Sequence, residues 1–279
     1  MKLCTTIQEM RQERARLGAV GFVPTMGFLH EGHLSLVRRA RAENEAVIVS
    51  LFVNPIQFGS ADDLANYPRA LERDVALLRE EGVACVFAPE AAAFYPEGFA
   101  TQVNPEGVAL ELEGPSRPGH FAGVATVLTK FFNIIQPQRA YFGQKDAQQC
   151  AVVRRFVKDL NIPVEIITLP TWREKDGVAG SSRNSRLTEA ERLQAPVLYQ
   201  ALCRARDLVQ AGERRRAVLE TAMRDVLVQA GLTEIDYATV VDPETFQAKE
   251  TFTEGALALL AVRLGAVRLI DNMPLLPVP

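Results

Sequence analysis

The stretch Ala19-Val-Gly-Phe-Val23, continued by Pro24-Thr-Met-Gly-Phe-Leu-His30-Glu-Gly-His33, decides how this chain folds. Its first part is a short apolar run that predicts a buried strand, and the Gly and Pro residues that follow predict a shaped turn. Residues 34–42 then have the amphipathic pattern of a helix. A helix that starts directly after such a turn presents N–H groups and the positive end of its dipole to an anion. We therefore expect residues 24–33 to form a nucleotide phosphate site.

The histidines of the chain strengthen this expectation. His30 and His33 belong to the turn, and His120 closes a second Gly- and Pro-rich segment, residues 114–120. A near-neutral imidazole is well suited to hold or protonate a phosphate oxygen at physiological pH. Two other interpretations of the pair stay open, a structural histidine and a zinc pair. Zinc is weakly supported, because the chain has no HExxH sequence and no thiol close to the pair.

Residues 19–169 alternate short β-branched runs with helical patterns. This alternation predicts an α/β fold in which a doubly wound parallel sheet carries helices on both faces. Ligands of such sheets bind beyond the carboxyl ends of the strands. The expected strands are 19–23, 46–53, 84–88, 139–142 and 164–169, and the expected helices are 34–43, 69–81, 124–135 and 148–160.

The pattern changes after Pro170. A polar loop over residues 172–184 precedes Thr188-Glu-Ala-Glu191, whose spacing predicts a capping box at the start of a helix. We predict two domains, a doubly wound domain over 1–171 and a smaller α+β lid domain over 172–279. In the second domain we expect helices over 188–211 and 214–230, and strands over 235–241, 257–263 and 267–271.

Composition excludes several classes of protein. A formal net charge of −3 and a pI near 5.8 argue against a protein built mainly to coat nucleic acid. The apolar stretches are too short to span a bilayer, so neither nucleic acid nor a membrane is an expected partner. The N-terminal residues lack the apolar core of a signal peptide, and the four cysteines show no paired spacing. We expect free thiols and a cytoplasmic protein.

Neutral amides follow the second expected strand. Asn54 and Gln57 offer both hydrogen-bond donors and acceptors, which suit the hydroxyl and carboxylate groups of a small polar ligand. The alternative for Asn54 is an amide that caps the turn after Pro55.

A second group of polar residues follows the strand expected over 139–142. Gly143 allows a ligand close to the chain, and Lys145 supplies a mobile cation for phosphate oxygens. Asp146 can accept hydrogen bonds from a ribose, or it can cap a helix instead. We expect the side chain of Gln149 to point toward the same ligand site.

The segment Ser181-Ser-Arg-Asn184 combines two hydroxyls, a guanidinium and an amide, which suits a triphosphate or its leaving group. The alternative is a solvated linker loop. We expect Asp62, Asp63 and Asp74 to be surface or helix-capping carboxylates. Asp74 is also a candidate to contact magnesium through water.

Together these segments closely resemble the pantothenate synthetase (pantoate–β-alanine ligase) family. HxGH alone marks a wider nucleotidyl-transferring superfamily that includes class I aminoacyl-tRNA synthetases. Its joint occurrence with FVNPIQF, FGQKDxQQ and SSRN is highly specific. The resemblance implies a Rossmann-like fold of the HxGH superfamily and a homodimer formed through the first domain. The matching stretches run in the family's order from the first strand to the C-terminus, as VPTMGFLHEGH, FVNPIQFG, YPRALERD, RPGHFAGVATVLTKFFNIIQP, YFGQKDAQQ, DGVAGSSRN and AVRLGAVRLIDN.

The resemblance implies a ligase that works in two steps. The carboxylate of (R)-pantoate attacks the α-phosphorus of Mg²⁺-ATP, which gives pantoyl adenylate and diphosphate. The amine of β-alanine then attacks the acyl carbon, and AMP and pantothenate are released. No covalent nucleophile is required, so the task of the protein is positioning and charge stabilisation.

The resemblance also assigns the site residues. The catalytic residues are His33, as proton donor, with His30, Lys145 and Arg183. Pantoate and β-alanine are assigned to Gln57, Gln149, Asn54 and Tyr67. The residues assigned to ATP are Pro24, Thr25, Met26, Gly27, Phe28, Leu29, His30, Glu31, Gly32, His33, Gly143, Gln144, Lys145, Asp146, Trp172, Gly180, Ser181, Ser182 and Arg183.

Two positions depart from the family's pattern. Gly180 stands where a larger apolar residue is usual, and Trp172 stands where the side chain is often smaller. A backbone contact with the nucleotide survives either change. The two changes affect side-chain packing around the nucleotide, and glycine is expected to loosen residues 177–184.

Two other functions stay open. A nucleotidyltransferase of the same superfamily would leave AMP on a phosphorylated acceptor. The amides of Gln57 and Gln149 favour a small acceptor with hydroxyl groups instead. A non-catalytic nucleotide-binding module would not need Lys145, His33 and Arg183 together.

Overall fold

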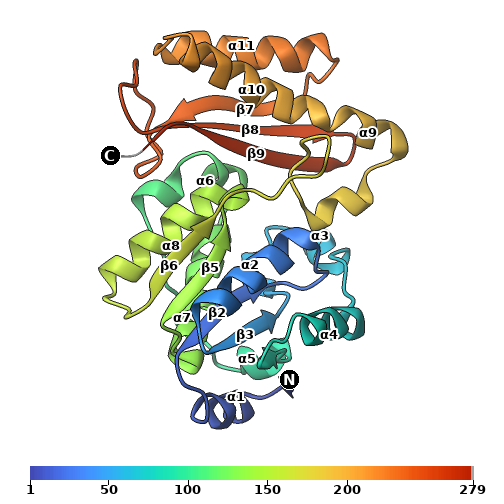
Figure 1. The fold of residues 1–279 in the computed structure, drawn as a ribbon, viewed down its shortest axis with the longest axis vertical. Coiled ribbons are helices and arrows are strands. Elements are labelled where there is room, and N and C mark those ends of the chain that lie inside the picture. Colours follow the sequence, from blue (N-terminus) through green and yellow to red (C-terminus); the bar gives the residue numbers. More distant parts are fainter. Residues whose placement is uncertain (278–279) are drawn as a thin grey trace. The chain divides into compact units, whose positions relative to one another are not determined.

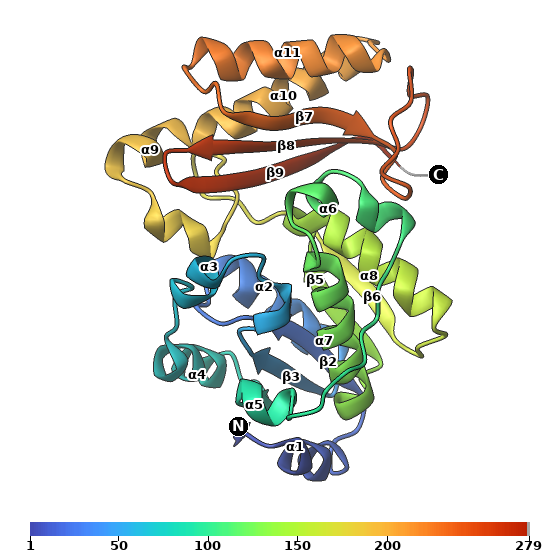
Figure 2. The same ribbon diagram turned by 180° about the vertical axis from the view of Figure 1, so that it is seen from behind.

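The computed structural model describes residues 1–277. The chain divides into two compact units, one of Met1–Gly143 with Val152–Leu169, and one of Gln144–Ala151 with the chain from Pro170 onward. Figures 1 and 2 show the elements of each unit from opposite sides. The domain boundary after residue 171 stays a prediction from the sequence.

The first unit is built on a six-stranded parallel sheet in the order β1-β4-β3-β2-β5-β6. Its strands are β1 (Lys2–Cys4), β2 (Val20–Thr25), β3 (Ala46–Leu51), β4 (Cys85–Phe87), β5 (Arg139–Gly143) and β6 (Glu165–Leu169). The register pairs Val20 with Ala46 and Thr25 with Leu51, so β2 and β3 end at the same level. The order of the strands reverses between β2 and β5. Such a switch point is where ligands of doubly wound sheets bind.

Helices lie on both faces of this sheet (Figures 1 and 2). The α-helices up to residue 159 are α1 (Ile7–Arg14), α2 (Glu31–Glu43), α3 (Ala61–Ala65), α4 (Leu71–Glu80), α5 (Ala91–Phe94), α6 (Glu113–Ser116), α7 (His120–Ile135) and α8 (Ala147–Asp159), and the 3-10 helices are η1 (Pro55–Gln57), η2 (Gly107–Leu110) and η3 (Gln144–Asp146). Neighbouring residues of β2 point to opposite faces. Val23 belongs to a buried cluster with Val37 of α2, whereas the ring of Phe22 lies 5.5 Å from that of Phe131 on α7.

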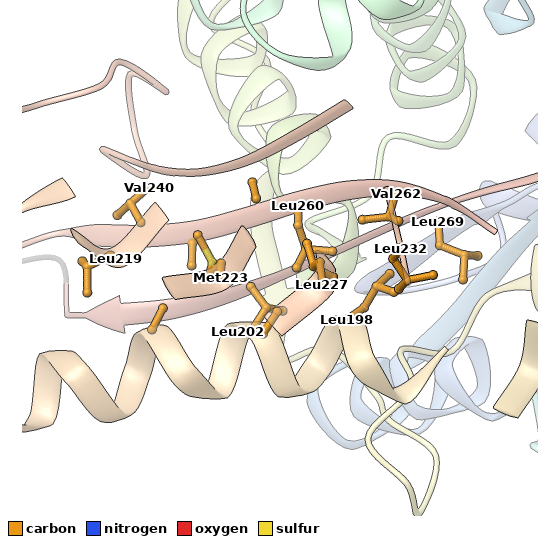
Figure 3. Close-up of a cluster of buried hydrophobic side chains, with 14 of the residues drawn as sticks. Leu198, Leu202, Leu219, Met223, Leu227, Leu232, Val240, Leu260, Val262 and Leu269 are labelled. Atoms are coloured by element: carbon orange, nitrogen blue, oxygen red, sulfur yellow. The ribbon is translucent and has the colours of Figure 1, made fainter. Parts of the chain in front are cut away.

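The second unit contains a three-stranded antiparallel sheet in the order β7-β8-β9. Its elements are η4 (Ser182–Arg186), α9 (Glu189–Gln194), α10 (Pro196–Gln210), α11 (Arg216–Gln229), β7 (Ile235–Val241), β8 (Ala256–Leu264) and β9 (Val267–Leu276). Leu202 of α10, Met223 of α11 and Leu260 of β8 are completely buried together, as Figure 3 shows. Full burial of such a side chain contributes roughly 1.5–3 kcal/mol, so this unit has a hydrophobic core of its own.

The fold predicted from the sequence is confirmed, because a parallel sheet with helices is combined with a small antiparallel sheet near the C-terminus. The capping box is also confirmed, since Glu191 donates its N–H to Thr188 Oγ1 and accepts the N–H of Thr188. The sequence patterns missed β1, which is too short to show a periodicity. They also ended the last strand at Asp271, although β9 continues to Leu276.

All four cysteines are free, as expected. Within residues 1–277, every helix is too short or too polar to cross a membrane.

Candidate active site

The sequence predicts a turn after β2, and the structure shows its backbone conformation. Gly27 and the following Phe28 both have positive φ angles, 85° and 52°. A positive φ is unusual for a bulky residue such as Phe28 and persists only where surrounding contacts enforce it. A Cβ on Gly27 would also lie 3.2 Å from Asp74 Oδ2. The turn therefore requires glycine at position 27 and external support at position 28.

Asp74 of α4 supplies that support. Its Oδ2 accepts the N–H of Phe28 at 2.6 Å, and its Oδ1 accepts the N–H of Leu29 at 2.9 Å. The expectation that Asp74 is a surface or capping carboxylate is wrong, because its side chain is only 1% exposed. Hydrogen bonds to a charged acceptor are stronger than those between neutral groups. The carboxylate therefore fixes the turn, and its contact with magnesium stays a prediction.

His30 and His33 lie side by side at the start of α2, with ring centroids 4.0 Å apart. His30 Nδ1 accepts the N–H of Gly32 at 3.1 Å, and His33 Nδ1 accepts the N–H of His30 at 3.3 Å. Histidine side chains thus accept both hydrogen bonds of a capping box at this helix N-terminus, an arrangement that we call the reciprocal cap. Because Nδ1 is the acceptor in each ring, a neutral imidazole carries its hydrogen on Nε2. The helix start therefore provides two neighbouring Nε2–H donors next to its own N–H groups.

The amides of Asn54 and Gln57 are joined to each other at the end of β3. Asn54 Nδ2 donates to Gln57 Oε1 at 3.0 Å and to the carbonyl of Gly123 at 3.1 Å. The Asn54 side chain makes no capping hydrogen bond to η1, so the capping alternative is wrong. Since Oε1 of Gln57 accepts from Asn54, its Nε2 points the other way, and it lies 3.1 Å from the sulfur of Met26. Gln57 thus presents a donor beside the residues of the turn.

Tyr95 fixes the orientation of Asn54. Its hydroxyl donates to Asn54 Oδ1 at 2.8 Å. Burial raises the pKa of Tyr95, so the hydroxyl stays protonated and remains a donor. The ring of Tyr95 packs at 5.2 Å from Lys130 Nζ, whose own pKa is lowered by burial. A relay of hydrogen bonds therefore runs from Tyr95 through Asn54 to Gln57.

His120 has a different position from the other two histidines. The guanidinium of Arg117 can only donate, so His120 Nε2 accepts from Arg117 Nη1 at 3.0 Å. Its Nδ1 then carries the hydrogen and donates to the carbonyl of Gln57 at 3.0 Å. His120 is buried and holds the backbone of Gln57 through this hydrogen bond. Tyr67, also buried, packs its ring edge-on against Phe58, the residue that follows Gln57.

In the second unit, Lys145 lies in η3, the short helix that precedes α8. Its Nζ is 3.6 Å from Asp146 Oδ1, and its side chain is 16% exposed. The backbone carbonyls of Gln144 and Lys145 accept hydrogen bonds from Asn272 Nδ2 at 2.9 and 2.8 Å. Gln149 lies half-buried in the first turn of α8. The position of Lys145 is thus tied to β9.

The segment from Trp172 to Asn184 is ordered by its own backbone. Gly180 donates to the carbonyl of Trp172 at 3.0 Å, and Gly177, with φ of 92°, donates to Glu174 and turns the chain. Ser181 Oγ accepts the N–H of Arg183 at 3.2 Å and caps η4. The linker alternative is therefore wrong for 181–184, because these residues form a capped, half-buried turn.

Sequence reasoning did not single out Tyr95, Lys130 or Asn272. It also missed the ion pair of Arg173 and Asp271, whose Nη1 and Oδ2 atoms lie 2.7 Å apart. Asp271 and Asn272 belong to the quoted C-terminal stretch AVRLGAVRLIDN, yet they were treated only as the end of a strand. The sequence does carry a signal for them, because two adjacent polar residues interrupt an apolar strand pattern. Within residues 1–277, no group of three or more His, Cys, Asp or Glu side chains is arranged to hold a metal ion.

Known proteins resemble this chain over its whole length. The family model described as Pantoate-beta-alanine ligase matches residues 2–274. The pantothenate synthetase of Gluconobacter oxydans (strain 621H) is 61% identical over 275 residues, which cover 99% of this chain and 100% of that protein. The pantothenate synthetase of Roseiflexus castenholzii is 55% identical, with 98% of each chain covered.

Solved structures give the same result. A crystal structure of pantoate-beta-alanine ligase (pantothenate synthetase) from Thermus thermophilus matches with a TM-score of 0.95 and 50% identity, covering 99% of this chain and 100% of that one. The pantoate-beta-alanine ligase of Francisella tularensis, complexed with beta-gamma ATP and beta-alanine, matches with a TM-score of 0.80 and 34% identity, covering 98% and 97% of the two chains.

Proposed function

We propose a role for each site residue from one premise, that this chain belongs to the pantoate-beta-alanine ligase family. It is an ATP-dependent ligase that condenses (R)-pantoate with β-alanine to give pantothenate, AMP and diphosphate through pantoyl adenylate. The observation that carries this conclusion is the family match over residues 2–274, since every segment of the candidate site lies inside that range.

In the first half-reaction, a carboxylate oxygen of pantoate attacks the α-phosphorus of ATP. The bond from that phosphorus to the oxygen bridging to the β-phosphorus breaks, and diphosphate leaves. Charge spreads over the phosphoryl oxygens in the transition state, so fixed donors and cations accelerate the step. We assign this role to the Nε2–H groups of His30 and His33 and to the cations Lys145 and Arg183. The reciprocal cap at the start of α2 supports the assignment of the histidines.

The acceptor side of the reaction is assigned to the amides. Gln57 donates through Nε2 to an oxygen of pantoate, and it also lies near β-alanine. Asn54, Tyr67 and Gln149 are assigned to the same two ligands. The relay from Tyr95 supports the role of Gln57, because a preoriented amide loses little rotamer entropy when it binds.

In the second half-reaction, the amine nitrogen of β-alanine attacks the acyl carbon of pantoyl adenylate. The bond from that carbon to the phosphate oxygen breaks, AMP leaves, and the nitrogen loses a proton. Water would hydrolyse the same mixed anhydride, so its exclusion is part of the mechanism. Buried Tyr67 and half-buried Met26 contribute apolar surface for that exclusion.

The remaining ATP contacts are assigned to four segments. The ribose is assigned to Gly143 and Asp146, with the neighbouring Gln144. The adenine is assigned to the backbone of Trp172, and the phosphates to the turn that Gly180 begins. The residues of the first turn assigned to ATP are Pro24, Thr25, Met26, Gly27, Phe28, Leu29, Glu31 and Gly32, and those of the second unit assigned to the phosphates are Ser181 and Ser182.

Magnesium enters the reaction with ATP as part of the substrate. Mg²⁺ keeps several water ligands and is usually bound through one or two carboxylates together with phosphates. Both oxygens of Asp74, the carboxylate suggested by the sequence, accept N–H groups of the turn. We therefore assign magnesium to the phosphates of ATP, with Asp74 in contact through water at most. The ion neutralises phosphate charge there.

Assembly and location are also proposals. We infer a homodimer formed through the first unit, which the similarity to the family supports, and a cytoplasmic protein, which the free thiols support. Sedimentation equilibrium tests the first, with a mass of twice the 30.7 kDa chain expected.

Exchange of labelled pyrophosphate into ATP tests the function directly. The ligase requires pantoate and magnesium for exchange, and it does not require β-alanine. Exchange that requires a phosphorylated acceptor in place of pantoate, with AMP transferred to that acceptor, would support the nucleotidyltransferase instead. ATP binding without exchange for any acid would support a non-catalytic module.

A further inference from the structure

Strand β9 carries two adjacent polar residues that are almost completely buried. Asp271 is 3% exposed and Asn272 is 2% exposed. A buried amide or carboxylate costs free energy unless its hydrogen bonds are made, so each needs an explanation. The mechanism described above uses neither residue.

Asn272 holds the turn that carries Lys145. Its Nδ2 donates to the carbonyls of Gln144 and Lys145, two consecutive residues of η3. Its Oδ1 faces the side-chain amide of Gln144 at a longer distance, 3.4 Å. A 3-10 helix as short as η3 is weak by itself. One amide that binds two successive carbonyls therefore sets the direction in which Lys145 leaves the backbone.

Asp271 holds the segment that follows Trp172. Its carboxylate accepts two hydrogen bonds from Arg173, at 2.7 and 2.9 Å, and the N–H of Asn272 at 2.7 Å. The guanidinium of Arg173 also donates to the carbonyl of Gly177 at 3.0 Å and lies 4.4 Å from the ring centroid of Tyr199.

The ion pair is therefore fixed on all sides. Burial raises the pKa of Asp271, and the Arg173 guanidinium opposes that rise. A bidentate Arg–carboxylate pair with this geometry fixes orientation as well as distance. The backbone of Arg173 also forms an isolated antiparallel β-bridge with Ala179, the residue before Gly180.

We infer that Asp271 and Asn272 are positioning residues for ATP binding. Asn272 orients Lys145 through its backbone, and Asp271 orients residues 172–180 through Arg173. Two segments assigned to ATP are thus held by neighbouring residues of one strand. This inference rests on the proposed function, because that function places ATP at Lys145 and at Trp172.

The first test is the kinetics of pyrophosphate exchange. For Asn272→Ala we expect the KM for ATP to rise about tenfold and kcat to fall about 10²-fold, since small misplacements of a catalytic group have effects of this size. The KM for pantoate should stay within a factor of about 2 of the parent value, well below the tenfold change that 1.4 kcal/mol produces. Loss of folded protein alone would lower the apparent kcat and leave both KM values unchanged.

Thr239→Val is the matched control. Thr239 lies on β7 of the same sheet, and its hydroxyl donates to Glu220 of α11. The Thr239→Val protein should be less stable than the parent, and its KM for ATP should be unchanged. Thermal unfolding shows whether the two variants lose a similar amount of stability. An Asn272→Ala protein with the ATP KM of the parent, or an equal rise in Thr239→Val, would overturn the inference.

The second test uses Trp172, the only tryptophan in the chain. Asp271→Asn removes the charge that binds Arg173, so the emission of Trp172 should shift in the absence of any ligand. The emission of Thr239→Val should match that of the parent, and an unshifted Asp271→Asn would contradict the positioning of residues 172–180. A parent protein without pantoate-dependent exchange would contradict the proposed function itself, which separates the two failures.

Discussion

Asp74 Oδ1 accepts the backbone N–H of Leu29 at 2.9 Å, although 45 positions separate the two residues in the chain. The other oxygen of the same carboxylate accepts the N–H of Phe28, the residue with the unusual positive φ. One buried carboxylate of α4 therefore determines how the turn reaches His30. This contact links the stability of the first unit to the geometry of its histidines.

The variant Asp74→Asn tests that link. Asparagine keeps one oxygen but turns an N–H donor toward a backbone N–H, so one hydrogen bond is lost and a repulsive contact replaces it. We expect the free energy of unfolding to fall by about 1–3 kcal/mol, the usual cost of an unsatisfied buried group. Turnover should fall by about 10²-fold, because the histidines lose their support. Urea denaturation and the pyrophosphate exchange assay measure the two effects.

Asp159→Asn is the control for this change. Asp159 pairs with Arg155 on the exposed surface of α8, with its side chain 45% exposed. Such a pair contributes at most about 0.5 kcal/mol, so stability and turnover should stay close to those of the parent. Full activity in Asp74→Asn would show that the turn keeps its shape without the carboxylate.

Tyr95→Phe tests the relay that ends at Gln57. The change removes the donor to Asn54 Oδ1 and lets the Asn54 amide rotate, which releases Gln57 Oε1. We expect the KM for pantoate to rise about fivefold to tenfold, equivalent to the roughly 1 kcal/mol of a typical hydrogen bond. The KM for ATP should not change. Steady-state kinetics with each substrate varied in turn provides the measurement.

Tyr141→Phe provides the comparison for the loss of a tyrosine hydroxyl. Tyr141 bonds to Glu43 and Asn44 at the other end of the sheet, and burial raises its pKa to about 12. The Tyr141→Phe protein should be less stable than the parent, and its KM values for pantoate and ATP should be unchanged. Equal effects of the two variants on the KM for pantoate would remove Tyr95 from the positioning of Gln57.

The contrast between Asp74 and His33 explains what could be predicted from the sequence. His30 and His33 are three positions apart, so the pattern of the turn and the reciprocal cap are local features of the sequence. The strands were also predictable, because β-branched runs show their periodicity locally. Asp74 and Asn272 act on residues far along the chain, and only the folded register brings them together. No local pattern encodes which carboxylate will meet which N–H group.

The same distinction applies to the alternatives that the structure removed. An Asn after a strand is commonly a cap, and the sequence around Pro55 fits that interpretation equally well. Besides Gln57, the Asn54 side chain bonds to Tyr95 and Gly123, which come from two other segments. The motif therefore predicts the region of the site, whereas the hydrogen-bonding role of each side chain required the fold.

Lys145→Ala tests the charge assigned to the phosphates. Removal of one preorganised donor in a site of this kind lowers turnover by roughly 10²–10³-fold. Both the pantoate-dependent exchange and the overall reaction should show the loss, because adenylation precedes amide formation. Lys158→Ala, at the exposed end of α8, should behave as the parent. Turnover of Lys145→Ala within a factor of about 3 of the parent, far from that range, would exclude Lys145 from the transition state.

Asp242 provides a test of stability against pH in the second unit. Burial by itself would raise the pKa of Asp242, but the hydrogen bonds from Lys249 and from the N–H groups of Thr245 and Glu244 outweigh it and lower the pKa to about 2, from 3.8. Because the folded pKa is the lower one, the unfolded chain takes up the proton first as pH falls. The stabilisation is therefore complete above about pH 4 and is lost as pH decreases toward about 2. A shift of this size corresponds to about 2 kcal/mol.

Asp242→Asn separates the charge from the turn. Asparagine still accepts the two backbone N–H groups, so only the contact with Lys249 is lost, and stability at about pH 7 should fall by about 1 kcal/mol. The difference in unfolding free energy between the two proteins should shrink between about pH 4 and pH 2, as the Asp242 carboxylate of the parent is protonated. Urea denaturation across this range measures it. A difference that stayed constant down to the acid end of this range would mean that Asp242 titrates no differently in the folded and unfolded chains.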